Sequence, residues 1–230
     1  MKNSLNLYYS RIFFLRSEIG RILALSIFFS VAMSIARTLY TGHLTFIFLI
    51  WNLFLAWIPY CLSQWLYYYQ HKIKSKIFLV AVLMIWLAFV PNTFYIITDL
   101  YHIGDGYNDY SMPQWFDLAM LLSFAWNGLL LGILSVRHIE KIIEAKLGMK
   151  HELLFLYPIM WLNALGVYVG RYLRFNSWDV VSNPFFLIKE IARVLIHPFA
   201  ERYAASMIFC FSILMTLFYL TLKKISKVIA

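Results

Sequence analysis

Residues 77–102 read IFLVAVLMIWLAFVPNTFYIITDLYH, and this stretch decides the fold. It is apolar without interruption from Ile77 to Val90. In lipid, every backbone polar group must be satisfied internally, and a continuous apolar run achieves this as a helix, whereas a membrane β-strand alternates apolar and polar residues. The stretch therefore predicts a transmembrane α-helix over about 77–97.

The same pattern recurs outward from this stretch in both directions. Further runs of roughly 20 residues, the length that crosses a bilayer, predict spans near 22–40, 44–68, 115–136, 153–171 and 204–222. The whole chain of 230 residues is 62% hydrophobic and only 13% charged, with a mean hydropathy of +0.71. We therefore expect an all-α membrane protein, a six-span transmembrane helical bundle that forms a single membrane domain over residues 1–230.

The distribution of basic residues predicts how the bundle is oriented. Of the 20 Lys and Arg residues, most fall in the two terminal segments and in the loops 70–76 and 137–152. Because basic loops stay in the cytoplasm, both termini of this multi-pass protein are predicted to be cytoplasmic. The net charge of +9 is not read as a sign of nucleic-acid binding, because that needs a basic face on a soluble domain.

Two segments outside the spans are predicted to lie at the membrane interface. Residues 1–21 form an amphipathic cytoplasmic segment. Residues 184–197 form a second amphipathic helix on the outer side, begun by Pro184 and stopped by Pro198, with a lid over an outward cavity as the alternative. A cleaved signal peptide ending at Ala36 is the alternative to a retained first span, but it would be unusually long.

The third span carries a polar stripe at its outer end. Asn92, Tyr95, Asp99 and His102 are spaced by one helical turn each, and Pro91 predicts a break in the helix where the stripe begins. Asp99 lies at a helix C-terminus, where the macrodipole disfavours an anion, so a cation, a metal ion or a buried proton should compensate it. The structural explanation is that these residues simply end the span among headgroups.

The fifth span supplies the opposite charge. Arg171 and Arg174 follow one face of that helix, and guanidinium groups suit two-point contacts with phosphate or carboxylate. Snorkelling to the headgroups is the structural explanation. Two glycine pairs, Gly128 with Gly132 and Gly166 with Gly170, have the spacing that lets helices approach closely, and we interpret them as packing sites.

These residues define a candidate site in which a charged network joins Asp99, Asp117 and Asp179 with the two arginines. The catalytic candidates are Asp99, His102 and Asp117; the candidates for substrate binding are Asn92, Tyr95, Arg171, Arg174, Asn176 and Asp179. Asp117 is the weaker acid of the site, because the start of its helix already welcomes an anion. Asp99 and His102 give only two ligands for a metal, and His43 or Asp117 would have to complete the set, so metal and cofactor stay unassigned.

Several short motifs resemble a known family. They are Pro91-Asn92 with Thr98-Asp99-Leu100, Trp115-Phe116-Asp117, and Gly170-Arg171 with Asn176-Ser177-Trp178-Asp179. Together they resemble a bacterial family of polytopic membrane proteins known only as a domain of unknown function, over about residues 52–213. The resemblance implies a bacterial cell membrane and a helical fold, and it brings no substrate, reaction or cofactor.

Two functions remain open from the sequence. The first is a membrane-embedded enzyme at the outer leaflet, where the arginines hold an anionic or lipid-linked substrate and Asp99 and His102 supply acid–base chemistry or metal ligands. The second is a transporter, binding protein or accessory subunit without catalysis. In both, the expected partner is the lipid bilayer and no nucleic acid is involved.

Overall fold

The computed structural model describes residues 18–73, 75–103, 112–148, 152–175, 184–196 and 201–229, and its regular structure there is helical. Six helical segments in these ranges are long and apolar enough to cross a membrane: Glu18–Thr41, Phe48–Tyr69, Lys76–His102, Gln114–Lys146, Glu152–Arg171 and Arg202–Ser226. The predicted set of six apolar helices of membrane length is therefore confirmed. The orientation of the termini stays a prediction.

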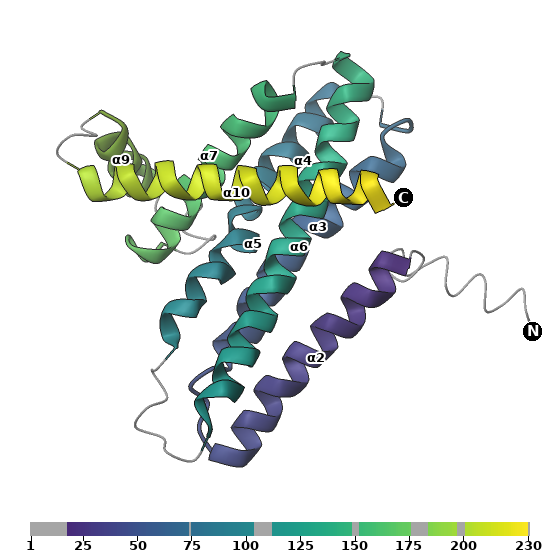
Figure 1. Ribbon diagram of the computed structural model, residues 1–230. Coiled ribbons are helices and arrows are strands. Elements are labelled where there is room, and N and C mark those ends of the chain that lie inside the picture. Colours follow the sequence, from purple (N-terminus) through teal and green to yellow (C-terminus); the bar gives the residue numbers. More distant parts are fainter. Residues whose placement is uncertain are drawn as a thin grey trace, which may run out of the picture.

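The helices pack around one long central helix. α6 (Gln114–Leu147) runs along α3 (Phe48–Tyr69) and packs against α2 (Glu18–Thr41). α10 (Arg202–Ile229) packs on α7 (Glu152–Arg171) and crosses the front of the bundle in Figure 1 instead of following its long axis. Contacts of Arg37 with Asp117 and of Phe48 with His102 bring the end of α2, the start of α3 and the start of α6 close together, and Asp99 meets the end of α7 there.

The predicted loop from Arg137 to Glu152 is wrong over most of its length, because α6 continues as a helix to Leu147. Apolar residues persist at helical spacing beyond the predicted span, and Ile139 and Ile142 are buried. The helix ends where Gly148 adopts a left-handed φ of 60° and its amide donates to Glu144 O at 3.1 Å. Hydropathy marks where an apolar environment ends, and an amphipathic helix can continue past that point.

The third span is built from three pieces. α4 (Lys76–Phe89) ends before Pro91, which begins the short helix α5 (Pro91–Tyr95), and a 3₁₀ helix, η2 (Ile96–His102), completes the segment. The predicted break at Pro91 is confirmed, and the predicted end near residue 97 is too early. Side chains bind carbonyls next to the break: Asn92 Nδ2 donates to Phe89 O at 2.9 Å, and Val90 O accepts from Thr93 Oγ1 at 2.7 Å as well as from the Thr93 amide at 3.1 Å.

Both glycine pairs pack closely against this broken segment, one pair from α6 and the other from α7. On α6, a Cβ at Gly128 would lie 2.6 Å from Thr93 O, and one at Gly132 would lie 2.5 Å from Thr93 Oγ1. On α7, a Cβ at Gly166 would lie 2.5 Å from Pro91 Cγ. α5 is thus held between α6 and α7 at distances that only glycine allows, which places the polar stripe beside the end of α7.

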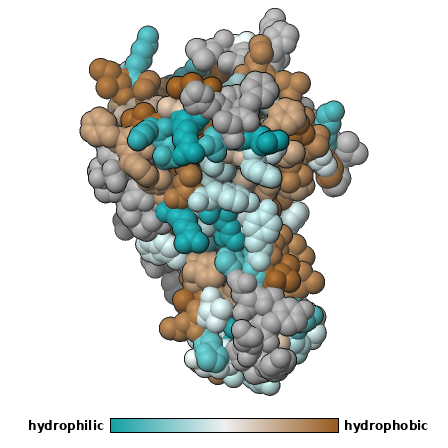
Figure 2. Space-filling view, turned by 90° about the vertical axis from the view of Figure 1, so that its left-hand side faces the viewer, coloured by the Kyte–Doolittle hydropathy of each residue, from teal (hydrophilic) through white to brown (hydrophobic). Residues whose placement is uncertain are grey.

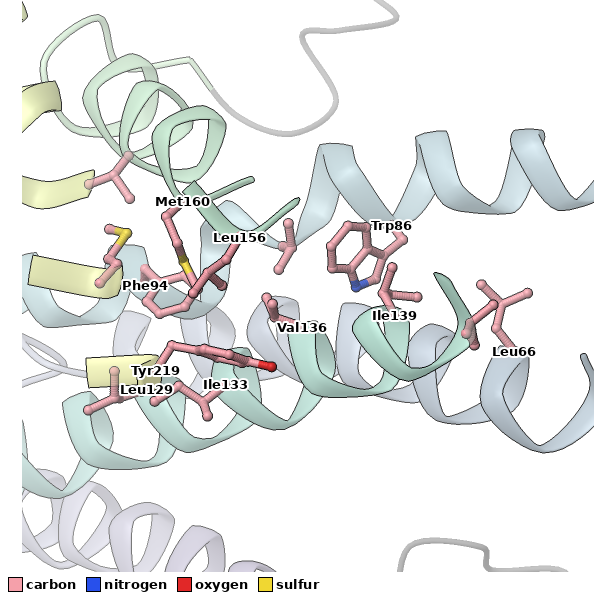
Figure 3. Close-up of a cluster of buried hydrophobic side chains, with 14 of the residues drawn as sticks. Leu66, Trp86, Phe94, Leu129, Ile133, Val136, Ile139, Leu156, Met160 and Tyr219 are labelled. Atoms are coloured by element: carbon pink, nitrogen blue, oxygen red, sulfur yellow. The ribbon is translucent and has the colours of Figure 1, made fainter. Parts of the chain in front are cut away.

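The apolar core joins side chains from most of these helices. In Figure 3, Phe94, Met160 and Tyr219 lie against one another, although they come from α5, α7 and α10. Two buried hydrogen bonds connect α4, α6 and α3. Trp86 Nε1 donates to Ser135 Oγ at 2.7 Å, and Ser135 Oγ donates to Pro59 O at 3.0 Å. This core positions α4, α6 and α7 and leaves the polar stripe at its edge.

The predicted helix over 184–197 is present as α9 (Pro184–Ile196). Val194 packs against α7 and α10, whereas Phe185 and Ile188 are exposed. The face of the molecule on which α9 lies has a hydrophilic patch across its middle, bordered by hydrophobic side chains (Figure 2). This amphipathic surface suits a membrane boundary, and the interfacial placement of α9 stays a prediction.

Candidate functional site

The 3₁₀ geometry of η2 brings Asp99 and His102 together. A 3₁₀ helix has three residues per turn, so side chains three positions apart eclipse one another. Asp99 and His102 have this spacing, and they project from one side of η2 toward α7. The sequence predicted a shared face from an α-helical period, and the tighter turn aligns the two residues more closely than that period would.

Asp99 is buried and lies among three polar neighbours, which we call the Asp99 cluster: Asn52, Asp99, His102 and Arg171. Asp99 is 1% exposed. Asn52 Nδ2 donates to its Oδ2 at 2.9 Å, and Arg171 NH1 lies 3.4 Å from its Oδ1. The second guanidinium nitrogen of Arg171, NH2, lies 3.1 Å from His102 Nε2. The compensation expected for Asp99 is therefore a cation, and that cation is Arg171.

The contact between Arg171 and His102 indicates where the imidazole carries its proton. A guanidinium group only donates hydrogen bonds, so Nε2 of His102 accepts and the ring proton belongs on Nδ1. The edge of the ring contacts Phe48, with ring centroids 5.1 Å apart. His102 Nε2 thus faces the guanidinium group of Arg171 as a hydrogen-bond acceptor.

Two tyrosines flank the guanidinium group of Arg171. Its central carbon lies 5.9 Å from the ring centroid of Tyr95 and 5.5 Å from that of Tyr101. Aromatic faces stabilise a cation without neutralising it. The Arg171 side chain is 16% exposed, so it is sheltered but still reachable.

Arg174 lies three residues beyond Arg171 and is not part of the cluster. It is exposed, and its φ of 56° is in the left-handed region. The turn that ends α7 closes when the amide of Phe175 donates to Val169 O at 3.3 Å. A left-handed residue after a helix is usually glycine, so an arginine here is unusual. Asn176 and Asp179 lie outside the described residues.

A cavity of about 300 Å³ adjoins the cluster. Its walls come from α3, α4, α5, α7 and α9, and they include Trp51, Asn52, Leu55, Leu87, Ala88, Pro91, Asn92, Tyr95, Leu162, Gly166, Gly170 and Ile191. Asn52 and Tyr95 belong to both the wall and the surroundings of Arg171. The predicted binding residues Asn92 and Tyr95 therefore lie in the cavity wall, and most of the other wall residues are apolar.

Asp117 has a different partner from the one the sequence suggested. Arg37 donates to it through Nε at 2.7 Å and through NH2 at 3.1 Å, and the guanidinium group lies 4.4 Å from the centroid of the Phe46 ring. Arg37 is 1% exposed. The predicted single network of Asp99, Asp117 and the arginines of α7 is thus replaced by two ion pairs. The start of α6 and Arg37 together account for a buried anion at Asp117.

Comparison with known proteins identifies the family. Residues 51–221 match the family model described as Protein of unknown function (DUF1361), which covers more than half of the chain. The chain belongs to this family. The predicted resemblance to a family of unknown function is confirmed, and the DUF1361 range includes all four residues of the Asp99 cluster but begins after Arg37. No curated protein and no solved structure matches the chain.

Several residues of the site were missed by sequence reasoning. Asn52, Phe48 and Tyr101 are absent from the candidates that the sequence predicts. The only signal was position: Asn52 lies near the start of α3, at the end of the bundle where α7 ends. No group of three His, Cys, Asp or Glu side chains that could hold a metal ion occurs among the residues described.

A second charged group, also missed, lies at the opposite end of the bundle. Glu140 accepts from Tyr219, from Arg137 and from Lys223 Nζ, the last at 2.6 Å, and Lys223 also lies 2.8 Å from Glu152 Oε1. These contacts tie α6, α7 and α10 together. Arg137 also lies 3.9 Å from Glu144 Oε1, so each basic side chain here has two acidic partners. We interpret this group as a structural clamp.

Proposed function

We propose that this protein is a membrane-embedded enzyme that acts on an anionic, lipid-linked substrate at the Asp99 cluster. The observation that carries the proposal is the junction of a buried charged cluster with an apolar cavity, because Asn52 binds Asp99 and also lines the cavity wall. A lipid with an anionic head has the same division into charged and apolar parts. The distribution of Lys and Arg supports an outward-facing site.

Arg171 is the residue that we assign to the anion. Its contact with Asp99 is long, 3.4 Å, and an oxyanion of a phosphate or carboxylate would offer a shorter, charge-assisted bond. When Arg171 turns to such a ligand, His102 loses the donor at Nε2 and that nitrogen becomes available to accept a proton. Asp99 then orients Arg171, and Asn52 orients Asp99.

Binding without catalysis is the second candidate, and one observation favours it. Both carboxylate oxygens of Asp99 already have partners, and the side chain is 1% exposed, so its task can be limited to holding Arg171. In that case the cluster recognises an anionic lipid for transport or assembly and changes no bond.

Two variants separate these possibilities. The purified protein is incubated with a bacterial lipid extract and the lipids are followed by mass spectrometry, while binding of dodecyl phosphate is measured on the same samples. We expect wild-type protein to convert a phosphate-bearing lipid. Arg171→Gln should lower dodecyl phosphate affinity at least tenfold, and His102→Gln should abolish turnover while affinity stays near that of wild type, because it removes the proton acceptor and keeps Arg171 and Asp99.

The matched control is Arg202→Gln, an exposed arginine at the start of α10, which should change neither binding nor turnover. Unchanged affinity in Arg171→Gln would overturn the anion site. Binding that depends on Arg171 but leaves every lipid intact would overturn the enzyme and establish the binding protein.

A further inference from the structure

The cavity beside the Asp99 cluster is lined mostly by apolar residues and has a few polar residues among them. The lining residues on α7 extend from Gly170 to Leu162, roughly 12 Å at the helical rise of about 1.5 Å per residue. The polar residues Asn52, Asn92 and Tyr95 lie toward the cluster, and Leu55 and Leu87 line it farther away. A mostly apolar lining of this length suits an extended hydrocarbon chain better than a compact polar solute.

The cavity exists because of residues already identified in the fold. The break before Pro91 and the close approach of Gly166 draw α5 toward α7, and Ala88 and Gly166 contribute almost no side chain to the wall. α3 lies on the opposite side of α5, so the space between α3 and α7 is left to the cavity. An apolar space of this size loses van der Waals contacts unless something fills it.

The mouth of the cavity lies on an apolar, exposed surface. Trp51 is 51% exposed and Leu162 is 38% exposed, and Ala88 is exposed as well. All three lie within helices of membrane length, where the surrounding solvent is hydrocarbon. A chain can therefore enter from the bilayer without crossing water.

We infer that this cavity holds one hydrocarbon chain of the lipid whose anionic head binds at the Asp99 cluster. The inference rests on the proposed function, and it adds that the lipid-linked substrate has a linear tail and that this tail lies in the cavity. Any lipid tail could fill the cavity, since a tail gains little by leaving the bilayer. The lipid whose head also pairs with Arg171 is the one retained.

Ala88→Phe fills the cavity and leaves the cluster untouched, and Ala81→Phe is the matched control two turns earlier on α4, exposed but outside the cavity. Binding of dodecyl phosphate and of inorganic phosphate is measured on the full chain in maltoside micelles. We expect wild-type protein to prefer dodecyl phosphate at least tenfold. In Ala88→Phe, the ratio of dodecyl phosphate affinity to inorganic phosphate affinity should fall at least fivefold, while the affinity for inorganic phosphate stays unchanged. Ala81→Phe should behave as wild type.

Photo-crosslinking gives a second measurement that needs no substitution. A dodecyl phosphate with a diazirine at the chain terminus should label peptides of α4 or α7 near Leu87 and Leu162, in competition with unlabelled dodecyl phosphate. Labelling confined to other helices, or equal affinity in Ala88→Phe and wild type, would overturn the tail site.

The two proposals fail in different ways. If Arg171→Gln abolishes binding of both probes while Ala88→Phe changes neither, the anion site stands and the tail inference is overturned. If Ala88→Phe weakens dodecyl phosphate binding while Arg171→Gln has no effect, the cavity takes a chain but the proposed headgroup site is overturned, and with it the inferred amphiphile.

Discussion

Two arginine–aspartate pairs lie at the same end of the bundle, and they differ in contact geometry and in the exposure of the arginine. Arg37 grips Asp117 through two bonds of 2.7 and 3.1 Å and is 1% exposed. Arg171 meets Asp99 through one contact of 3.4 Å, shares its second nitrogen with His102, and is 16% exposed beside a cavity. The residue types are the same, but only the second pair has an arginine that a ligand can reach.

The difference teaches how to separate a structural ion pair from a candidate site in a membrane protein. In a buried pair joined by two hydrogen bonds, the two charges neutralise each other. Removing one partner leaves the other charge uncompensated in a low-dielectric medium. A loose pair at a cavity leaves part of its bonding capacity for a third group. The following predictions test this contrast, beginning with the largest expected effect.

Arg37→Ala should be the most destabilising change, because it strands the buried carboxylate of Asp117. Loss of one partner of a buried pair costs about 3–5 kcal/mol. We expect a loss of that size in the free energy of unfolding, measured by SDS titration and circular dichroism. Arg171→Ala should cost less, because its contact with Asp99 is longer and Asp99 keeps the 2.9 Å hydrogen bond from Asn52.

The double variant Arg37→Met with Asp117→Leu sharpens the same test. Replacing both charges with apolar side chains of similar size is often neutral or stabilising, so most of the lost stability should return. If the double variant is as unstable as Arg37→Ala, the stability lost in Arg37→Ala does not come only from the uncompensated charge of Asp117. Dodecyl phosphate binding should be unchanged in the double variant, and loss of binding there would contradict the separation of the two pairs.

Gly166→Ala tests whether the loose pair depends on the packing of α5. The new Cβ would lie 2.5 Å from Pro91 Cγ, so the segment that carries Asp99 must move. Overpacking of this kind costs about 1–3 kcal/mol. Gly170→Ala is the graded control, because its Cβ would lie 3.3 Å from the Tyr95 ring, and it should cost less. Equal stabilities for both variants in SDS titration would contradict the inference that close packing at Gly166 holds α5 in place.

Asn52→Leu removes the bond that holds Asp99 in place. Hydrogen bonds between membrane helices contribute about 0.6 kcal/mol on average and up to about 1.7, and the stability loss should fall in this range. Asn127→Leu, which removes a 2.8 Å bond to Ser30, is the control of similar size. Only Asn52→Leu should change dodecyl phosphate affinity, and an equal change in both variants would argue against a positioning role for Asn52.

The sequence predicts the helices that carry the two ion pairs, but not which arginine binds each aspartate. Six apolar runs, the break at Pro91 and the glycine pairs follow from local rules, because hydropathy and helix chemistry act along the chain. The partners of Asp99 and Asp117 are separated from them by 72 and 80 positions. Both acids can be placed at the same end from the sequence, but which arginine each one meets depends on how the helices rotate and pack.

The ends of the elements were harder to predict for a similar reason. α6 continues past its apolar run because Ile139 and Ile142 find a core to pack against. η2 tightens into a 3₁₀ helix where hydropathy gives no signal. Asn52 could not be distinguished from other polar residues within helices, because its significance comes from contact with Asp99.

Arg174→Gly is expected to have the smallest effect on stability and decides whether a second arginine belongs to the loose pair. A left-handed residue other than glycine is strained by about 1–2 kcal/mol, whereas glycine costs about 0.5–1 kcal/mol in entropy. Stability should therefore stay the same or rise by up to about 1 kcal/mol. If Arg174 assists Arg171, dodecyl phosphate affinity should fall severalfold in Arg174→Gly and stay near wild type in Arg174→Lys, which keeps the charge and the strain. Equal affinity in all three proteins would leave Arg171 as the sole cation of the site, and the contrast with Arg37 would then rest on that one side chain.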